Sequence, residues 1–222
     1  MSKQFIIILV ALFAIFGGII VFAKRGDNKS VIDTSAGSQN VFSNVDSKVE
    51  VVEYGDFQCP ACRAYYPIIK QVESQYGDRV KIRFRHLPLT NIHPNAMAAH
   101  RAAQGAAAQG AFWQMHDILY ERQDQWSAAN NPEKFFEDYA KEIGLDLELF
   151  KTDSASPETA AIINSDIAIA KEFGFTGTPS FSLNGKEIER PTDFAGFAKL
   201  LDDALAQNQS QIPMGDTVPV AE

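Results

Sequence analysis

Cysteine, histidine and basic residues are scarce in this chain of 222 residues. It has two cysteines, four histidines, and 20 lysines and arginines against 28 acidic residues, for a net charge of −8. A zinc site needs a second cysteine pair or a Cys/His set at suitable spacing, so we expect no metal site. The acidic balance argues against nucleic acid as a partner, because phosphate binding needs clustered Lys and Arg. The length and the 45% hydrophobic content predict one folded domain.

Residues 1–23 differ from everything after them because they contain a long apolar run. Phe5 to Ala23 carries no charge and would span about 28 Å as a helix, which suits a membrane crossing. Val21-Phe22-Ala23 leaves a cleaved signal segment as an alternative. The run is longer than the roughly 7 to 15 residues of a signal peptide core, which favours an uncleaved anchor. The positive charges that flank the run do not favour export of the domain, so the expectation of export rests on the cysteine chemistry alone.

Composition predicts where the folded domain begins and ends. Residues 24–45 are rich in Gly, Ser, Asn and Asp, which is typical of a flexible linker. Residues 207–222 are polar and interrupted by prolines, which predicts a disordered tail. The folded domain is therefore expected over 46–206.

Within this domain the hydrophobic patterns predict an α/β fold. The expected order is a strand at 49–54, a helix from Pro60 to about Tyr76, a strand at 80–87, a helical block at about 94–173, a hairpin at 180–189 and a helix from near Thr192. Asn184-Gly185 is a strong hairpin signal. The strand at 80–87 alternates apolar and basic residues, and we interpret its basic face as protection of a sheet edge. Parallel strands joined by a helix predict a sheet covered on both faces.

The two cysteines form a Cys-x-x-Cys motif, Cys59-Pro60-Ala61-Cys62, between the first strand and its helix. The amide dipoles of a helix start stabilise a thiolate there. We therefore predict that Cys59 is the nucleophile of a redox centre and that Cys62, one turn further in, is more covered. An inert buried pair is the alternative.

Together with these cysteines, three stretches carry a resemblance to a known family. "VEVVEYGDFQCPAC", "HPNAMAAH" in the helical block and "GTPSF" at the hairpin resemble DsbA-like thiol:disulfide oxidoreductases of the membrane-tethered bacterial kind. The resemblance covers about residues 45–206 and implies a thioredoxin fold interrupted by a helical domain. It also implies a cis peptide bond at Thr178-Pro179 beside the disulfide, with the Thr178 backbone free to pair with an extended substrate. An ordinary trans turn is the alternative.

Glu53 stands out as an acid on the strand that precedes the motif. By alternation it shares a face with Val49 and Val51, and that face is apolar. The resemblance implies that Glu53 is the buried acid beneath the active site and passes a proton to or from Cys62. The alternative is that Glu53 simply faces solvent.

Other residues near the motif are expected to contact the substrate or to lie at the ends of strands and helices. Substrate contact is expected from Thr178, Pro60, Ala61 and Phe57, although an aromatic residue at the position of Phe57 more often belongs to the core. His93 is expected at a helix entry or on the surface, and His86 at the end of a strand. The strongest oxidants of the family have a histidine where this chain has Ala61, which puts the strength of oxidation in question.

These observations predict a membrane-tethered, extracytoplasmic enzyme that oxidises cysteine pairs in exported proteins. A separate membrane partner would restore the Cys59–Cys62 disulfide, no metal or organic cofactor is expected, and the chain is expected to be a monomer. One alternative is a reductase or isomerase that draws electrons from a membrane donor. Another is a non-catalytic chaperone with the same fold.

Overall fold

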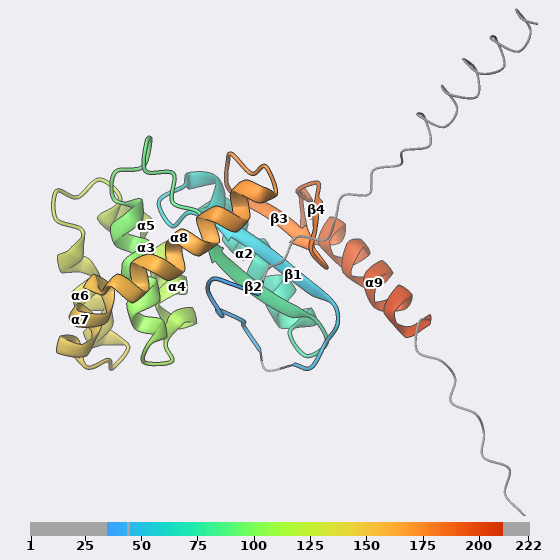
Figure 1. Ribbon diagram of the computed structural model, residues 1–222, viewed down its shortest axis with the longest axis horizontal. Coiled ribbons are helices and arrows are strands. Elements are labelled where there is room, and N and C mark those ends of the chain that lie inside the picture. Colours follow the sequence, from blue (N-terminus) through green and yellow to red (C-terminus); the bar gives the residue numbers. More distant parts are fainter. Residues whose placement is uncertain (1–34, 44, 211–222) are drawn as a thin grey trace, which may run out of the picture. The chain divides into compact units, whose positions relative to one another are not determined.

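The computed structural model describes residues 35–43 and 45–210, and its centre is a four-stranded sheet with the strand order β2-β1-β3-β4 (Figure 1). β1 runs parallel to β2 and antiparallel to β3, which pairs with β4 in a hairpin. The strands are β1 (Glu50–Gly55), β2 (Lys81–His86), β3 (Ser180–Leu183) and β4 (Lys186–Ile188). The helices are α2 (Pro60–Tyr76), α3 (Ala96–Ala107), α4 (Phe112–Glu121), α5 (Gln123–Trp126), α6 (Glu133–Glu142), α7 (Leu147–Ala155), α8 (Pro157–Glu172) and α9 (Phe194–Ser210).

Helices cover both faces of the sheet, as the strand pattern predicts. α2 and α9 pack on one face, where Val51 of β1 meets Val72 and Leu201. α8 packs on the other face, where Tyr54 of β1 meets Ile169. Successive residues of a strand point to opposite faces, so Glu53 lies on the same face as Val51, under α2.

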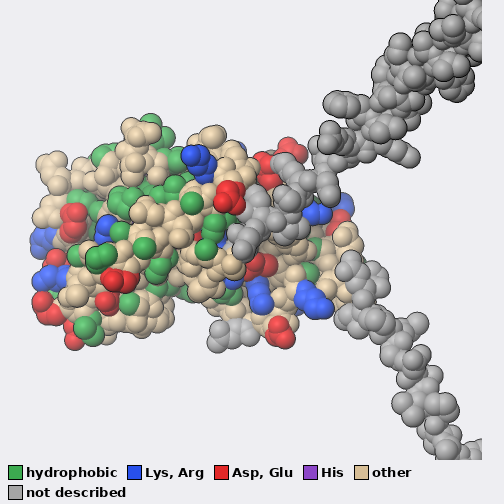
Figure 2. Space-filling model, in the orientation of Figure 1, with side chains coloured by type: hydrophobic (Ala, Val, Ile, Leu, Met, Phe, Trp, Pro, Cys, Tyr) green, Lys and Arg blue, Asp and Glu red, His purple; other side chains and the backbone are tan. Residues whose placement is uncertain are grey.

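Helices α3 to α7 form an insertion between β2 and α8 with a hydrophobic core of its own. That core also contains Phe57, Cys62 and Phe84, so the insertion packs directly on the cysteine motif. Hydrophobic side chains gather over this insertion on the face drawn in Figure 2. The expected thioredoxin fold with a helical insertion is confirmed, but α8, which was expected within the insertion at about 94–173, packs on the sheet instead.

The hairpin turn is confirmed by its backbone. Asn184 and Gly185 have φ angles of 51° and 71°, the positive values that a tight hairpin turn requires. The Asn184 side chain also accepts a hydrogen bond from the Glu50 amide at 2.9 Å, which joins the turn to the central strand.

The segment before the first strand is not a linker over residues 35–43, contrary to expectation. The Phe42 amide donates to the Ile82 carbonyl at 2.8 Å, and the Phe84 amide donates to the Asn40 carbonyl at 3.0 Å. The segment therefore pairs with the open edge of β2, and Ser38 is 1% exposed. Its polar side chains, which suggested flexibility, instead form hydrogen bonds within the fold.

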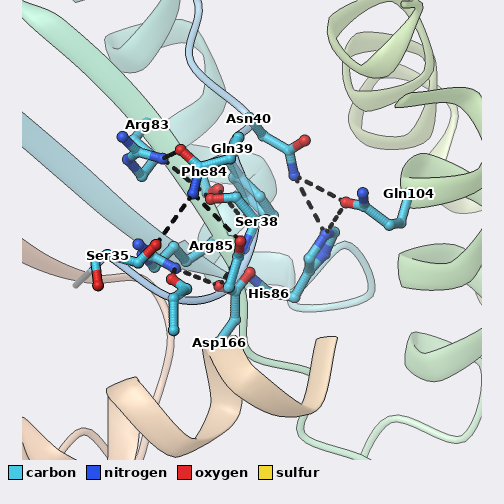
Figure 3. A network of polar contacts seen from close by, with 12 residues as sticks. Ser35, Ser38, Gln39, Asn40, Arg83, Phe84, Arg85, His86, Gln104 and Asp166 are labelled. Atoms are coloured by element: carbon cyan, nitrogen blue, oxygen red, sulfur yellow. Dashed lines mark hydrogen bonds and ion pairs between the residues drawn. The ribbon is translucent and has the colours of Figure 1, made fainter. Parts of the chain in front are cut away.

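A buried ion pair joins this segment to the sheet and to α8 (Figure 3). Arg85 of β2 donates to Asp166 of α8 at 2.6 Å, and both side chains are 0% exposed. Asp166 also accepts hydrogen bonds from the backbone amides of Ser38 and His86, and Arg85 donates to the Ala36 carbonyl. The interpretation of the basic residues of this strand as edge protection is therefore wrong for Arg85, which is a core residue.

The far end of the domain also differs from the prediction. Asp193, rather than Thr192, accepts a hydrogen bond from an amide in the first turn of α9, that of Gly196. α9 then runs to Ser210, so the expected disorder is wrong for residues 207–210. Residues 207–210 contain no glycine or proline, so the helix can continue beyond the residues that pack on the sheet.

The remaining terminal predictions cannot be compared with the structure. The predicted anchor, residues 1–23, lies outside the described residues, as do residues 24–34 of the linker and 211–222 of the tail. Within 35–43 and 45–210, no helix is both long and apolar enough to cross a membrane.

Replacing Asp166 with alanine is expected to destabilise the fold strongly. The substitution leaves the Arg85 guanidinium buried without its carboxylate, which typically lowers the free energy of unfolding by about 3 to 5 kcal/mol. Urea denaturation followed by circular dichroism measures this loss. Asp138→Ala is the matched control, since that carboxylate is 54% exposed in another helix and its loss should change little. Equal effects of the two substitutions would contradict a structural role for the buried pair.

Candidate active site

The two cysteines lie where β1 passes into α2. Cys59 is the residue just before the helix, with extended backbone angles, and Pro60 is the first helical residue. Proline suits this position because its missing N–H has no helical partner there. Cys59 is 7% exposed and Cys62 is 0% exposed, and both are free thiols. The prediction that Cys62 is more buried than Cys59 is confirmed.

The two thiols have opposite electrostatic surroundings. A hydrogen bond from Cys62 is the largest influence on Cys59. Together with smaller effects of Thr178 and of the amides of Cys62 and Ala61, it outweighs burial and lowers the pKa of Cys59 to about 5. Burial and the neighbouring Cys59 and Glu53 raise the pKa of Cys62 well above its ordinary value. At neutral pH Cys59 is therefore a thiolate, whereas Cys62 keeps its proton. The thiolate is the reactive form of a cysteine.

The loop before β3 completes the surroundings of Cys59. The peptide bond Thr178-Pro179 is cis, as the family resemblance implies. In its thiol form Cys59 lies 3.6 Å from the Thr178 carbonyl oxygen, to which it donates. The cis bond therefore lies directly beside the reactive sulfur.

Glu53 is buried beneath the motif, and the alternative that it faces solvent is wrong. The residue is only 6% exposed. Burial first, and then the negative charges of Glu73 and Cys59, raise the pKa of Glu53 to about 8. At neutral pH the carboxyl group therefore keeps its proton.

A second buried acid, Glu73, was not predicted. It lies on α2 with a side chain that is 2% exposed and forms an ion pair with Lys70. Burial outweighs that ion pair and raises the pKa of Glu73 to about 7. The available signal was an acid on the apolar stripe of the helix between Ile69 and Tyr76.

Asp56 is another important residue that the sequence reasoning missed. Its carboxylate accepts hydrogen bonds from the Gln58 amide at 2.8 Å, the Leu89 amide at 2.9 Å and the His93 ring at 2.7 Å. Its own amide donates to the sulfur of Cys62 at 3.5 Å. Although burial raises the pKa of Asp56, hydrogen bonds from histidine rings and the Leu89 amide more than offset this and lower it. His93 therefore belongs to the site and is more than a helix-entry residue.

Behind Asp56 lies a buried pair of histidines at the junction of sheet and insertion. The Nδ1 atoms of His86 and His100 are 2.7 Å apart, so one ring must donate and the other accept. Figure 3 shows the opposite edge of His86 pointing toward Gln104 and Asn40. Burial lowers the pKa of His86 to about 4, so this ring is neutral. His86 ends its strand as expected and also links the insertion to the N-terminal segment.

The expected substrate contacts divide into exposed and buried residues. Pro60 and Ala61 are exposed and Thr178 is partly exposed. Phe57 is 0% exposed and stacks on Phe84 with ring centroids 4.9 Å apart, so its expected role in substrate binding is wrong. The ring fills the junction between the sheet and the insertion.

A pocket of about 570 Å³ opens beside the start of α2. Its lining includes Gln58, Pro60, Arg63, His93, Gln123 and Asp124. Gln123, which the sequence reasoning missed, donates to the carbonyl oxygens of Phe57 and Cys59. The insertion thus holds the backbone of the motif as well as bounding this pocket.

Comparison with known proteins agrees with this geometry. The family model described as "Thioredoxin" matches residues 35–203. A solved thioredoxin-like oxidoreductase from Silicibacter pomeroyi is 26% identical, with a TM-score of 0.66 over 82% of this chain and 99% of that one. BdbD from Bacillus subtilis is 22% identical, with a TM-score of 0.67 over 80% of this chain and 100% of that one. DsbA from Xylella fastidiosa is 19% identical, with a TM-score of 0.62 over 77% and 91%. The last two show similarity of fold.

The chain is also similar to part of several longer proteins. A Na(+)/H(+) antiporter NhaA 3 of Salinispora tropica is 37% identical over 161 residues, which are 72% of this chain and 24% of the relative. NhaA 1 of Salinispora arenicola is 38% identical over 174 residues, 78% of this chain and 26% of the relative. The chain therefore spans about a quarter of these relatives, and their names describe the longer proteins.

Replacing Glu53 with glutamine is expected to stabilise the fold at neutral pH. Between pH 4.5 and about 8 the folded protein keeps the Glu53 proton that the unfolded chain has released, so stability falls as the pH rises through this window. The Glu53→Gln chain has no such loss, and its free energy of unfolding at pH 7 should exceed that of the parent by on the order of 3 kcal/mol. The difference should vanish below about pH 4. Denaturation at several pH values measures it, with Glu148→Gln as the exposed control.

Removal of Cys62 is expected to raise the pKa of Cys59. The rate of alkylation of Cys59 by iodoacetamide follows its thiolate, so it should rise with pH around a midpoint near 5. In Cys62→Ala the largest stabilising hydrogen bond is lost, and the midpoint should move up by about one unit or more. An unchanged midpoint would show that Cys62 does not stabilise the thiolate.

Proposed function

The chain belongs to the thioredoxin family, and from this we propose that it introduces disulfide bonds into exported proteins by thiol:disulfide exchange through Cys59 and Cys62. The observation that carries the proposal is the asymmetry of the two thiols. Cys59 has a pKa of about 5, whereas the pKa of the buried Cys62 is raised. In such a pair Cys59 is stable as a leaving thiolate, whereas Cys62 stays protonated until it reacts.

The proposed reaction has two exchange steps. A substrate thiolate attacks the sulfur of Cys59 in the Cys59–Cys62 disulfide, that bond breaks, and its electron pair leaves on Cys62. The protonated carboxyl group of Glu53 gives this sulfur a proton. The second thiolate of the substrate then attacks the substrate sulfur of the mixed disulfide, and Cys59 leaves as a thiolate. The substrate is oxidised and the enzyme pair is reduced.

The pKa of Cys59 supports the oxidising direction. A stable leaving thiolate favours reduction of the enzyme and hence oxidation of the substrate. Values for such motifs run from about 3.5 in a strong oxidant to about 7 in thioredoxin, and about 5 lies between them. Since Ala61 supplies no positive charge, hydrogen bonds to Cys59 account for the lowered value.

Substrate recognition is proposed at the exposed rim of the motif. Pro60 and Ala61 would contact the substrate, and the backbone of Thr178, held by cis-Pro179, would pair with an extended chain. The hydrophobic side chains visible over the insertion (Figure 2) are suited to reduced, unfolded clients. The redox-active cysteine pair would act without a metal or organic cofactor, and the chain would act as a monomer.

The cellular setting follows from the chemistry. Disulfides persist in oxidising compartments, which places an oxidant outside the cytoplasm. We propose that residues 1–23 tether the domain to the membrane and that a membrane redox partner restores the Cys59–Cys62 disulfide. Protease treatment of intact cells, or of cells whose outer layer has been removed, should cleave the domain. Protection in both cases would overturn this location.

A reductase or isomerase and a binding chaperone are the competing functions. The potential of the cysteine pair, measured by equilibration with glutathione buffers, decides the direction of electron flow. We expect a value near or above about −180 mV, whereas a value near about −270 mV would make the domain a reductant.

Cys59→Ser is expected to abolish oxidation of a reduced test protein, since the attacked sulfur is removed. Cys62→Ala, with Cys59 first joined to glutathione, should instead accumulate a mixed disulfide with a test peptide that has one cysteine: the peptide thiolate attacks the sulfur of Cys59, glutathione leaves as a thiolate, and no Cys62 is present to release the peptide. Gel analysis after thiol trapping measures both outcomes. Full protection of an aggregating client by Cys59→Ser, with no oxidation by the parent chain, would favour the chaperone.

A further inference from the structure

The insertion carries a buried tyrosine hydroxyl near the cysteine pair. The proposed exchange reaction does not use this hydroxyl. Tyr120 lies on α4 and is 1% exposed. Among the described residues its hydroxyl has no hydrogen-bond partner. A buried hydroxyl without a partner is unfavourable, so a native structure that keeps one calls for an explanation.

The hydroxyl lies over the end of β1, on the face covered by α2. A Cβ atom at Gly55 would be 3.0 Å from the Tyr120 oxygen. Gly55 and Glu53 are two residues apart in β1 and therefore share a face. Cys62 is buried in α2 above this face and receives the Asp56 amide at 3.5 Å. The Tyr120 ring and Cys62 belong to the same buried cluster, and the hydroxyl lies beside the end of the strand that carries Glu53.

The tyrosine ring is held firmly in this position. Its centroid lies 5.1 Å from that of Phe57 and 5.0 Å from that of His116. A side chain at Gly55 would clash first with the Phe84 ring, at 2.5 Å, so glycine lets both this ring and the Tyr120 hydroxyl approach the strand. Packing on several sides prevents the ring from swinging its oxygen toward solvent.

The hydroxyl keeps its proton and is therefore a donor. Burial first, and then the negative charge of Cys62, hold the pKa of Tyr120 well above its ordinary value, with smaller effects from Glu53, Asp56 and Cys59. Around Cys62 itself, burial, Cys59 at the start of α2 and the charge of Glu53 on β1 raise the pKa, and the backbone amide of Asp56 lowers it.

We propose that Tyr120 is a positioning residue whose hydroxyl donates a hydrogen bond to the sulfur of Cys62 while that sulfur carries negative charge. The role rests on the proposed exchange through the two cysteines. When Cys62 leaves, the hydroxyl stabilises its thiolate until the Glu53 proton arrives. When Cys62 attacks, Glu53 takes the proton and the hydroxyl stabilises the attacking thiolate. Tyr120 itself neither gains nor loses a proton.

A single-turnover reaction of the full chain tests this role. Cys59 is first joined to glutathione in a mixed disulfide. The thiolate of Cys62 then attacks the sulfur of Cys59, the Cys59–glutathione bond breaks, and its electron pair leaves on glutathione. In Tyr120→Phe we expect glutathione release to be about threefold to tenfold slower at neutral pH, because fewer Cys62 thiolates form.

The matched control is Tyr66→Phe, which removes the hydroxyl of a neighbouring ring. Tyr66 donates to Glu121 at 2.9 Å near the surface, and its ring centroid is 5.8 Å from that of Tyr120. We expect this variant to release glutathione at the parent rate. The alkylation rate of Cys59 should be the same in all three chains. Equal release from Tyr120→Phe and the parent, or an equal slowing of Cys59 alkylation, would overturn the proposal.

A second measurement separates this inference from the proposed function. In the Cys59→Ser chain with ¹³C-labelled cysteine, the titration of Cys62 is followed by nuclear magnetic resonance. Tyr120→Phe should move that titration to higher pH by about one unit, since a hydrogen bond to a charged group is lost, and Tyr66→Phe should not move it. A parent chain that never releases glutathione would refute the exchange function, and the titration would still decide the role of Tyr120.

Discussion

The carboxylate of Asp56 is the interaction on which the arrangement of the site depends. It lies in the short loop between β1 and α2 and accepts hydrogen bonds from that loop, from the Leu89 amide and from the His93 ring. These donors come from both the sheet region and the entry to the insertion. A buried carboxylate is stable only when such donors replace its water. The loop is therefore held in one conformation, which directs the Asp56 amide to Cys62.

The difference in pKa between the two thiols follows from the way the sheet, α2 and the insertion pack around them. The start of α2 supplies backbone amides to Cys59, and the Thr178 loop approaches the same sulfur. Cys62 lies one turn further in, between the sheet that carries Glu53 and the insertion that carries Tyr120. Hydrogen bonds lower one pKa while burial raises the other. The same fold that hides Cys62 thus leaves Cys59 as the reactive sulfur.

Much of this was predictable because the signals are local. The Cys-x-x-Cys motif after a β-branched strand, Pro60 at the first helical position and Asn184-Gly185 between short strands each depend on a few neighbouring residues. The alternation that groups Glu53 with Val51 correctly predicted burial. Residues 35–43 were misjudged because their composition is polar, and only the pairing with β2 and the Arg85–Asp166 ion pair gives those polar groups partners. Phe57 was misjudged because an aromatic residue beside a motif suits either a surface or a core.

By itself the sequence determined the order of strands and helices, the position of the two cysteines at a helix start and the face on which Glu53 lies, since backbone propensity and periodicity act over a few residues. The tertiary structure decided which polar residues meet that pair. Asp56 with His93, Gln123 with the motif backbone, and Tyr120 with Gly55 are separated by 37, 64 to 66, and 65 positions. Their contacts arise only when the insertion packs on the sheet, because no local pattern specifies which distant group will face a buried sulfur.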